Sequence, residues 1–167
     1  MFPRKLHELI KSKLFQKKAI IIVGARQTGK TTLGIKLVNE YARNKPVKIF
    51  NCDNPTDRDL LNNKDLEFLQ HLIENYYIIL IDEGQKVPSI GQTLKLLVDH
   101  YKDKKQFIVT GSSGFNLLNS TSEALTGRKF VYQLYPLSVE EIYGKDPITL
   151  IKELETLLIY GSYPDVI

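Results

Sequence analysis

The chain has 167 residues, of which 43% are hydrophobic and 25% are charged, and its net charge is +4. These values predict one globular domain with a buried core, and nothing in the sequence indicates disorder or repeats. The single cysteine, Cys52, excludes a disulfide framework and a cysteine zinc site, fits a reducing compartment, and is expected to be a small buried residue.

The N-terminal part of the chain is strongly basic and begins with an expected helix, Arg4–Phe15. Residues 1–48 hold twelve lysines and arginines against two acids, whereas residues 49–167 hold eleven against seventeen. Such a basic half can mark a nucleic-acid partner. Most of these residues are lysines of the kind that solvate exposed faces, and only Phe15 and Tyr41 lie near them as stacking groups. The sequence therefore favours a solvated surface and keeps nucleic-acid binding as the weaker alternative.

A strand, Ala19–Val23, a glycine-rich loop and a helix, Lys30–Arg43, come next. Residues 24–31 read Gly-Ala-Arg-Gln-Thr-Gly-Lys-Thr, which matches the Walker A pattern G-x-x-x-x-G-K-[ST] at every fixed position. Backbone N–H groups of such a loop and the helix dipole that follows bind polyphosphate. Lys30 is expected to reach the β- and γ-phosphates, and Thr31 to hold Mg²⁺ through its hydroxyl. The predicted nucleotide-binding residues are Gly24, Ala25, Arg26, Gln27, Thr28, Gly29, Lys30, Thr31 and Thr32.

Strands and helices then alternate along the middle of the chain. The expected elements are strand Val47–Asn51, helix Asp57–Glu74, strand Tyr77–Ile81, helix Ile90–Tyr101, strand Gln106–Thr110, helix Leu117–Leu125 and strand Phe130–Leu134. This alternation predicts an α/β fold, a parallel sheet with helices on both faces. In such a sheet the ligand binds beyond the carboxyl ends of the strands.

Membrane segments are not expected. The apolar run Tyr76–Ile81 is far too short to cross a bilayer, and the N-terminus lacks the apolar stretch of a signal peptide. The sequence therefore predicts a soluble, cytoplasmic protein without a membrane partner.

The third expected strand ends in two adjacent carboxylates, Asp82 and Glu83, in the form of a Walker B element. Many strands end in a solvated acidic turn, so this pattern alone is weak. About fifty residues after a phosphate-binding loop it indicates a catalytic pair. Asp82 would hold Mg²⁺, and Glu83 would polarise the attacking water as general base.

Two further positions have a functional and a structural interpretation. Hydroxyl residues at the end of the fourth strand, Thr110 or preferably Ser112, can sense the γ-phosphate, or residues 110–113 can simply form a turn that caps the next helix. Arg128, just after Gly127 and before the fifth strand, can supply positive charge to phosphoryl transfer in its own or a neighbouring subunit. It can equally be a surface residue at a helix C-terminus.

From Pro136 onward only helices are expected, at Val139–Tyr143 and Ile148–Tyr160. We therefore predict a core of residues 1–135 and a small helical lid over residues 136–167. The last seven residues form a turn-rich stretch without a polar tail, which predicts a lid that is cut short.

These motifs together resemble the predicted AAA+ ATPases of bacteria and archaea. The resemblance covers nearly the whole chain, and its most specific part is the Asp-Glu-x-Gln-Lys-x-Pro segment at residues 82–88. It implies a P-loop NTPase αβα sandwich with strand order 5-1-4-3-2 and an ATP-hydrolysing core usually followed by a domain of unknown function. It also implies a sensor at Ser112 and an arginine finger at Arg128. One departure is that no arginine follows Arg128, so a lid sensor is absent, lies further along the chain, or is replaced by a lysine such as Lys152.

The sequence thus predicts Mg²⁺-dependent ATP hydrolysis that drives a conformational or partner-binding change, with ATP and Mg²⁺ as cofactors. A homo-oligomer and a protein partner of unknown kind remain open. A small-molecule kinase and a non-hydrolysing ATP-binding module are the alternatives, and the Asp-Glu pair, suited to activating water, disfavours both. A GTP switch is disfavoured because no Asn-Lys-x-Asp motif is present; Asn63-Lys64-Asp65 is one residue short and falls in an expected helix.

Overall fold

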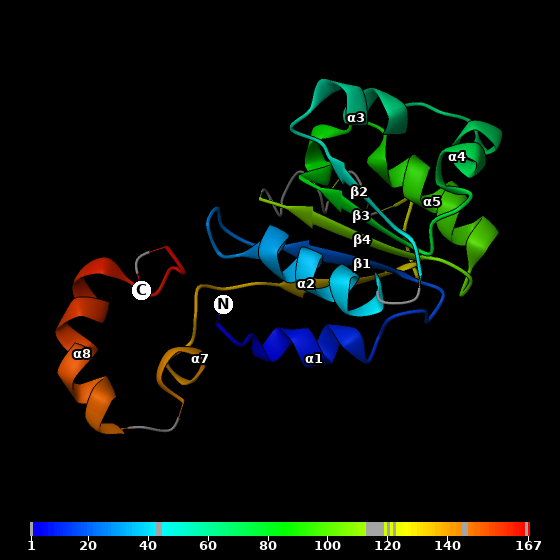
Figure 1. The fold of residues 1–167 in the computed structure, drawn as a ribbon. Coiled ribbons are helices and arrows are strands. Elements are labelled where there is room, and N and C mark those ends of the chain that lie inside the picture. Colours follow the sequence, from blue (N-terminus) through cyan, green and yellow to red (C-terminus); the bar gives the residue numbers. More distant parts are fainter. Residues whose placement is uncertain are drawn as a thin grey trace.

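The computed structural model describes residues 2–42, 45–112, 119, 121, 123–144, 147–165 and 167. At its centre a sheet lies between two layers of helices (Figure 1). The strands are β1 (Ala19–Val23), β2 (Val47–Asn51), β3 (Ile78–Asp82), β4 (Gln106–Gly111) and β5 (Lys129–Gln133). The helices around them are α1 (Lys5–Lys11), α2 (Lys30–Ala42), α3 (Pro55–Leu61), α4 (Leu66–Ile73) and α5 (Ile90–Tyr101), with a 3-10 turn η1 (Gly84–Lys86). Over the described ranges, no helix is both long and apolar enough to span a bilayer.

The sheet is parallel throughout, with the order β2-β3-β4-β1-β5. Read from the other edge this is 5-1-4-3-2, so the predicted topology and the P-loop NTPase sandwich are confirmed. The register places Val23 beside both Gly111 and Gln133, and Asn51 beside Asp82. The carboxyl ends of the strands therefore meet at one edge of the sheet, where ligands bind in this architecture.

Two hydrophobic clusters fill the two faces of the sheet. Because side chains alternate along a strand, β1 gives Ile21 to one cluster and Ile20 to the other, and both side chains are fully buried. Helices α3, α4 and α5 cover the first face, and α1 and α2 cover the second. All residues of β1, β3 and β4 are buried, which makes the central strands a rigid support for the loops at their ends.

The expected helix Asp57–Glu74 is wrong as a single element, because α3 and α4 are separated by a break at residues 62–65. Asn63 has a φ of 51°, in the left-handed region that does not continue a helix. Asp65 then caps α4, its carboxylate accepting from the Phe68 N–H at 2.8 Å. The Asn63-Lys64-Asp65 segment consequently lies between helices, not within one.

The first helix is also shorter than expected and ends at Lys11. Phe15 and Lys17, in the segment that follows, adopt positive φ values of 59° and 60°. Residues 117, 118, 120 and 122 of the expected helix Leu117–Leu125 lie outside the described residues, as does Ser113, and residues 123–125 form a turn.

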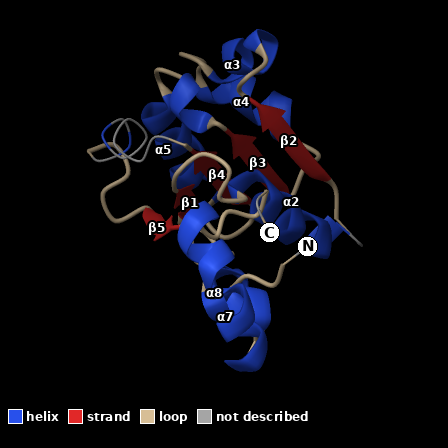
Figure 2. Cartoon of the chain, turned by 90° about the vertical axis from the view of Figure 1, so that its left-hand side faces the viewer, coloured by secondary structure: helices blue, strands red, loops and turns tan. Residues whose placement is uncertain are grey.

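Two more helices, α7 (Val139–Tyr143) and α8 (Pro147–Tyr160), follow β5, and Figures 1 and 2 place them off the carboxyl end of the sheet. A capping box starts α7: Ser138 Oγ accepts from the Glu141 N–H at 3.2 Å, and Glu141 accepts from the Ser138 N–H at 2.9 Å. Arg4 links this lid segment to the core. Its guanidinium donates to the carbonyls of Thr28, at 3.3 Å, and Tyr135, and lies 3.5 Å from the Glu141 carboxylate.

Candidate nucleotide site

The loop between β1 and α2 is tightly held before any ligand enters. Gly24 lies against the chain after β5, where an added Cβ would be 2.2 Å from the Leu134 carbonyl oxygen. Gly29 has a φ of 89°, a conformation that favours glycine. Thr28 Oγ1 and Lys30 Nζ both donate to the Ala25 carbonyl, at 2.9 and 2.5 Å. These contacts fix the curl of the loop.

Lys30 lies at the start of α2 and is only 5% exposed. Burial lowers the pKa of its ammonium, while the nearby carboxylates of Glu83 and Asp82 act in the opposite direction. Its recorded hydrogen bond goes to a neutral carbonyl of its own loop, and no described carboxylate lies within ion-pair distance. An anion placed at this loop would therefore be attracted by a positive charge that is partly shielded from water.

Thr31 and Asp82 form a cluster of oxygen ligands at the base of the loop. Thr31 Oγ1 donates to both carboxylate oxygens of Asp82, at 2.8 and 3.0 Å, and Thr110 Oγ1 also donates to Oδ1. A hydroxyl beside a carboxylate is a donor set that suits Mg²⁺, which also takes water and phosphate oxygens. No group of three or more His, Cys, Asp or Glu that could hold a metal ion occurs among the described residues.

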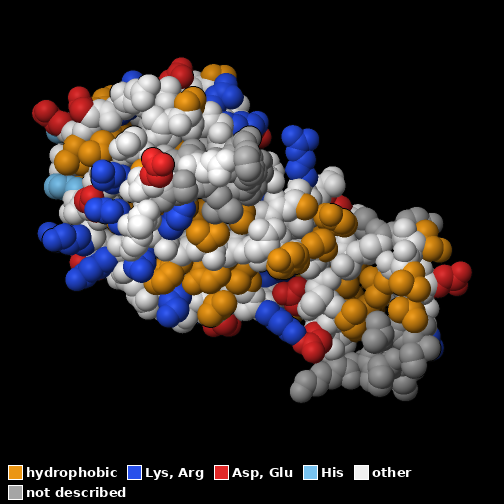
Figure 3. Space-filling model, turned by 180° about the vertical axis from the view of Figure 1, so that it is seen from behind, with side chains coloured by type: hydrophobic (Ala, Val, Ile, Leu, Met, Phe, Trp, Pro, Cys, Tyr) orange, Lys and Arg blue, Asp and Glu red, His pale blue; other side chains and the backbone are white. Residues whose placement is uncertain are grey.

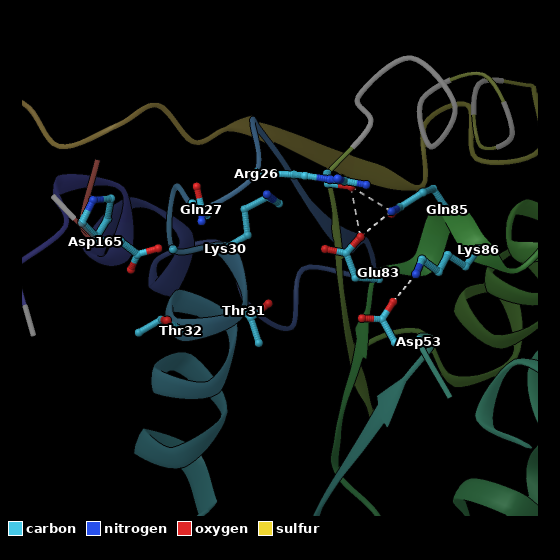
Figure 4. A pocket seen from close by; sticks show the side chains of 13 residues that line it. Arg26, Gln27, Lys30, Thr31, Thr32, Asp53, Glu83, Gln85, Lys86 and Asp165 are labelled. Atoms are coloured by element: carbon cyan, nitrogen blue, oxygen red, sulfur yellow. Dashed lines mark hydrogen bonds and ion pairs between the residues drawn. The ribbon is translucent and has the colours of Figure 1, made fainter. Parts of the chain in front are cut away.

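Glu83 follows β3 in an uncommon conformation, with φ 54° and ψ 41°. Its N–H donates to Thr110 Oγ1 at 3.2 Å. Its carboxylate oxygen Oε2 accepts hydrogen bonds from Ser112 Oγ, at 3.1 Å, and from Gln85 Nε2. Figure 4 shows both dashed contacts reaching this oxygen while the other turns to the side of the pocket where Lys30 lies. The predicted base and sensor are thus joined in one network.

One cavity of about 440 Å³ unites most of the predicted site. The lining residues that the sequence predicted are Arg26, Gln27, Gly29, Lys30, Thr31, Thr32, Glu83 and Ser112. Asp82 meets this set through Thr31. Gly24 and Ala25 are not among the lining residues: Gly24 packs against the Leu134 carbonyl, and the Ala25 carbonyl accepts the hydrogen bond from Lys30. Thr28 lines a neighbouring cavity.

The same cavity is lined by residues that sequence reasoning missed or left undecided: Asp53, Gln85, Lys86, Pro164 and Asp165. Lys86 and Asp53 form an ion pair at its edge. The position of Gln85, two residues after the acid pair, was a signal in the sequence. Nothing in the local pattern indicated that residues 164 and 165, beyond the lid helix, would return to the loop.

A second cavity of about 310 Å³ lies beside the loop and shares Gly29, Thr32 and Pro164 with the first. Its other lining residues are Phe2, Arg4, Thr28, Leu33, Lys36 and Leu137. It therefore brings apolar side chains from the N-terminus, α2 and the lid together next to the loop.

Arg128 does not line either cavity. It precedes β5, at the amino end of the sheet, and its Nε donates to Asp99 of α5 at 2.5 Å. This bond raises the pKa of the guanidinium. A role within its own subunit has no geometric support, since the phosphate loop lies at the opposite ends of the strands. Lys152, the suggested lid substitute, is exposed on α8 and also lies outside both linings.

Two curated proteins are similar to this chain over most of its length. The uncharacterized proteins Mb2031c of Mycobacterium bovis and Rv2008c of Mycobacterium tuberculosis are each 33% identical over 129 residues, 77% of this chain but 27% of theirs. The chain thus spans about a quarter of the length of these relatives.

Two solved structures share the fold at low sequence identity. AMPPCP-bound DnaA from Aquifex aeolicus has a TM-score of 0.64 at 16% identity, over 97% of this chain and 57% of that one. PCH-2 from C. elegans has a TM-score of 0.59 at 16% identity, over 96% of this chain and 49% of that one. The family profile described as AAA domain (AAA_14) matches residues 16–143, and the chain therefore belongs to the AAA domain family.

Proposed function

We propose that this chain binds ATP with Mg²⁺ and hydrolyses it. The observation that supports this most strongly is the single cavity lined by Lys30, Thr31, Glu83 and Ser112, at the carboxyl ends of the central strands. The cavity combines a buried cation for phosphate, oxygen ligands for a metal and a carboxylate for water. The AAA-type fold is suited to this chemistry, and DnaA, a structural neighbour, binds the nucleotide analogue AMPPCP.

Each residue has a distinct part in the proposed reaction. Lys30 exchanges its bond to the Ala25 carbonyl for β- and γ-phosphate oxygens. The Thr31 hydroxyl and the Asp82 carboxylate hold Mg²⁺, which when bound neutralises phosphate charge. Glu83 takes a proton from the attacking water through its free carboxylate oxygen, and Ser112 stabilises the γ-phosphate or the water.

The second cavity is our proposed site for the adenosine end of the nucleotide. It is lined mainly by apolar groups, including Phe2, Leu33 and Leu137, and it adjoins the loop. Pro164, at the end of the lid segment, lines both cavities. Nucleotide binding there would change the contacts of the lid, which gives a physical route for coupling hydrolysis to a conformational or partner-binding change.

Hydrolysis is favoured over a non-hydrolysing binding module by the state of Glu83, because a binding module needs no base. A kinase would use the same carboxylate for an acceptor hydroxyl, and ATP turnover without an added acceptor distinguishes the two reactions. Here a carboxylate oxygen without a described hydrogen-bond donor faces the cavity (Figure 4).

The test is ATP turnover with Mg²⁺ for the wild-type chain and two variants. Lys30→Ala is expected to abolish ATP binding, because the phosphates lose their buried counter-charge. Glu83→Gln is expected to keep ATP affinity and slow turnover by about a hundred- to ten-thousandfold. Unchanged affinity in calorimetry of Lys30→Ala would remove the phosphate-loop assignment, and wild-type turnover by Glu83→Gln would remove the proposed base.

We further propose nucleic acid as a partner, at the end of the molecule away from this site. The amino ends of the strands and the segments that lead into them, residues 12–18, 45–48, 74–77, 102–105 and 126–129, hold ten basic residues against the acids Glu74 and Asp103. Figure 3 shows blue side chains gathered at this end, on the left of the view. Aromatic rings that are distant in sequence lie under several lysines: Lys45 is 3.6 Å from the Tyr77 ring centroid and Lys18 is 4.8 Å from that of Phe130.

Binding of a single-stranded DNA oligonucleotide, measured by fluorescence anisotropy against salt, tests this partner. Lys17→Glu at the basic end is expected to weaken binding and to flatten the salt dependence, because a phosphate contact is lost. The matched Lys152→Glu on α8 is expected to have no effect. Equal losses in both variants, or no binding by the wild type, would reject a specific surface.

A further inference from the structure

Gln85 occupies a central position in the site without an assigned role. It lies in η1, directly after the acid pair, and lines the cavity with Glu83 and Ser112. Its amide nitrogen Nε2 donates to Glu83 Oε2 and to Ser112 Oγ, the latter at 3.1 Å. Since a carboxylate only accepts hydrogen bonds, the amide must present its nitrogen to Glu83. The three side chains therefore form a closed triangle of hydrogen bonds.

The two carboxylate oxygens of Glu83 differ in their hydrogen bonds. Oε2 receives both donors, whereas no described residue donates to Oε1. In Figure 4 Gln85 reaches Glu83 from the side away from Lys30, so it holds the carboxylate without standing between it and the cavity. The other oxygen is turned to the side of the cavity where Lys30 lies (Figure 4).

Two features of this arrangement are energetically unfavourable. Gln85 Oε1 is buried and has no hydrogen-bond partner among the described residues. The Glu83 backbone has a φ of 54°, which non-glycine residues seldom adopt. Unpaired buried polar atoms and unusual backbone angles are retained where function requires a particular geometry. Both features occur at the two residues that aim the carboxylate.

We propose that Gln85 is a positioning residue that fixes the Glu83 carboxylate for water activation. This inference rests on the proposed ATP hydrolysis. Gln85 acts through Glu83: its N–H group restrains rotation of the carboxylate, so that Oε1 takes the proton of the water from a fixed place. Ser112 supplies the second restraint and links it to the end of β4.

The test compares Gln85→Met, which keeps the length of the side chain and removes its hydrogen bonds, with Gln70→Met. Gln70 lies on α4, where its side chain bonds His100, away from both cavities. We expect Gln85→Met to lower kcat for ATP about ten- to a hundredfold and to leave KM within about twofold, because positioning is lost while phosphate binding is not. The control is expected to keep the wild-type kcat. A wild-type kcat in Gln85→Met would overturn the inference.

A double-mutant cycle separates this role from a merely structural one. In the Glu83→Gln background, Gln85→Met is expected to cause no further loss, since the group it positions is already gone. If it slowed the residual turnover by the same factor as in the wild type, Gln85 would act independently of Glu83 and the inference would fail. If the wild-type chain did not hydrolyse ATP, or Glu83→Gln turned over normally, the proposed function would fail first.

Discussion

Replacing Gly24 by alanine tests whether the phosphate loop depends on its contact with the chain after β5. The added Cβ would lie 2.2 Å from the Leu134 carbonyl oxygen, so the two segments must separate by about 1 Å to reach ordinary contact. Leu134 is held by a 2.7 Å hydrogen bond from its N–H to the Val23 carbonyl, at the end of β1. The contact cannot relax freely, because Gly24 and Leu134 directly follow two neighbouring strands of the central sheet.

Overpacking of this kind costs about 1–3 kcal/mol of unfolding free energy. For a chain of this length, a loss of about 2 kcal/mol lowers the unfolding temperature by about 4–8 °C. ATP affinity is expected to fall as well, since the loop moves relative to Lys30. Thermal denaturation followed by circular dichroism and an ATP titration measure the two effects.

Gly34→Ala is the matched control, because Gly34 lies inside α2 and its added Cβ would meet the flexible tip of Leu80 at 3.0 Å. Alanine is favoured there by about 0.5–1 kcal/mol of helix propensity, which offsets the tight contact. The control is expected to stay within about 1 kcal/mol of the wild type. Equal stability and ATP affinity in Gly24→Ala and the wild type would refute the steric reasoning.

Three other predictions concern residues around the site. Arg4→Ala removes donors to two backbone carbonyls and is expected to destabilise the chain by about 1–3 kcal/mol, measured by urea denaturation, and to weaken ATP binding as the lid loosens; unchanged ATP affinity would contradict the link. Burial raises the pKa of the Cys52 thiol to about 12. Alkylation of the folded chain by iodoacetamide at pH 8 is therefore expected to be about a thousandfold slower than alkylation of the chain unfolded in urea. A rapid reaction of the folded chain would show an accessible thiolate. Arg128→Ala, if Arg128 serves a neighbouring subunit, is expected to keep ATP affinity and lose about a thousandfold in turnover, with partial recovery on mixing with Lys30→Ala. Full activity of Arg128→Ala would leave Arg128 only as the ion-pair partner of Asp99.

The sequence predicts best where chemistry fixes the spacing. The loop of residues 24–31 and the acid pair Asp82 and Glu83 could be predicted because a phosphate site needs those residue types at the carboxyl ends of buried strands. The strand order followed from the family resemblance, and the structure has it. Helix ends were harder to predict, because a left-handed residue such as Asn63 divides a pattern that otherwise reads as one helix.

What could not be predicted depends on contacts between distant segments. Ser112 and Gln85 are 27 residues apart, and their hydrogen bond exists only because β3 and β4 are neighbours in the sheet. The aromatic interleaving at the basic end was judged poor from neighbours in sequence, whereas Tyr77 and Phe130 reach the lysines through the fold. The return of Asp165 to the cavity likewise requires the path of the lid segment.

At Glu83 the left-handed backbone conformation favours glycine for stability, whereas the proposed hydrolysis requires a carboxylate. Glycine adopts that conformation without steric cost, so Glu83→Gly would relax the turn after β3 while it removes the proposed base. A selection for thermal stability alone would therefore accept glycine at this position, and the resulting protein would be more stable to heat and would lack the proposed base. Efforts to stabilise this chain should hold residue 83 fixed and seek their gains elsewhere, in loops that do not line the cavity.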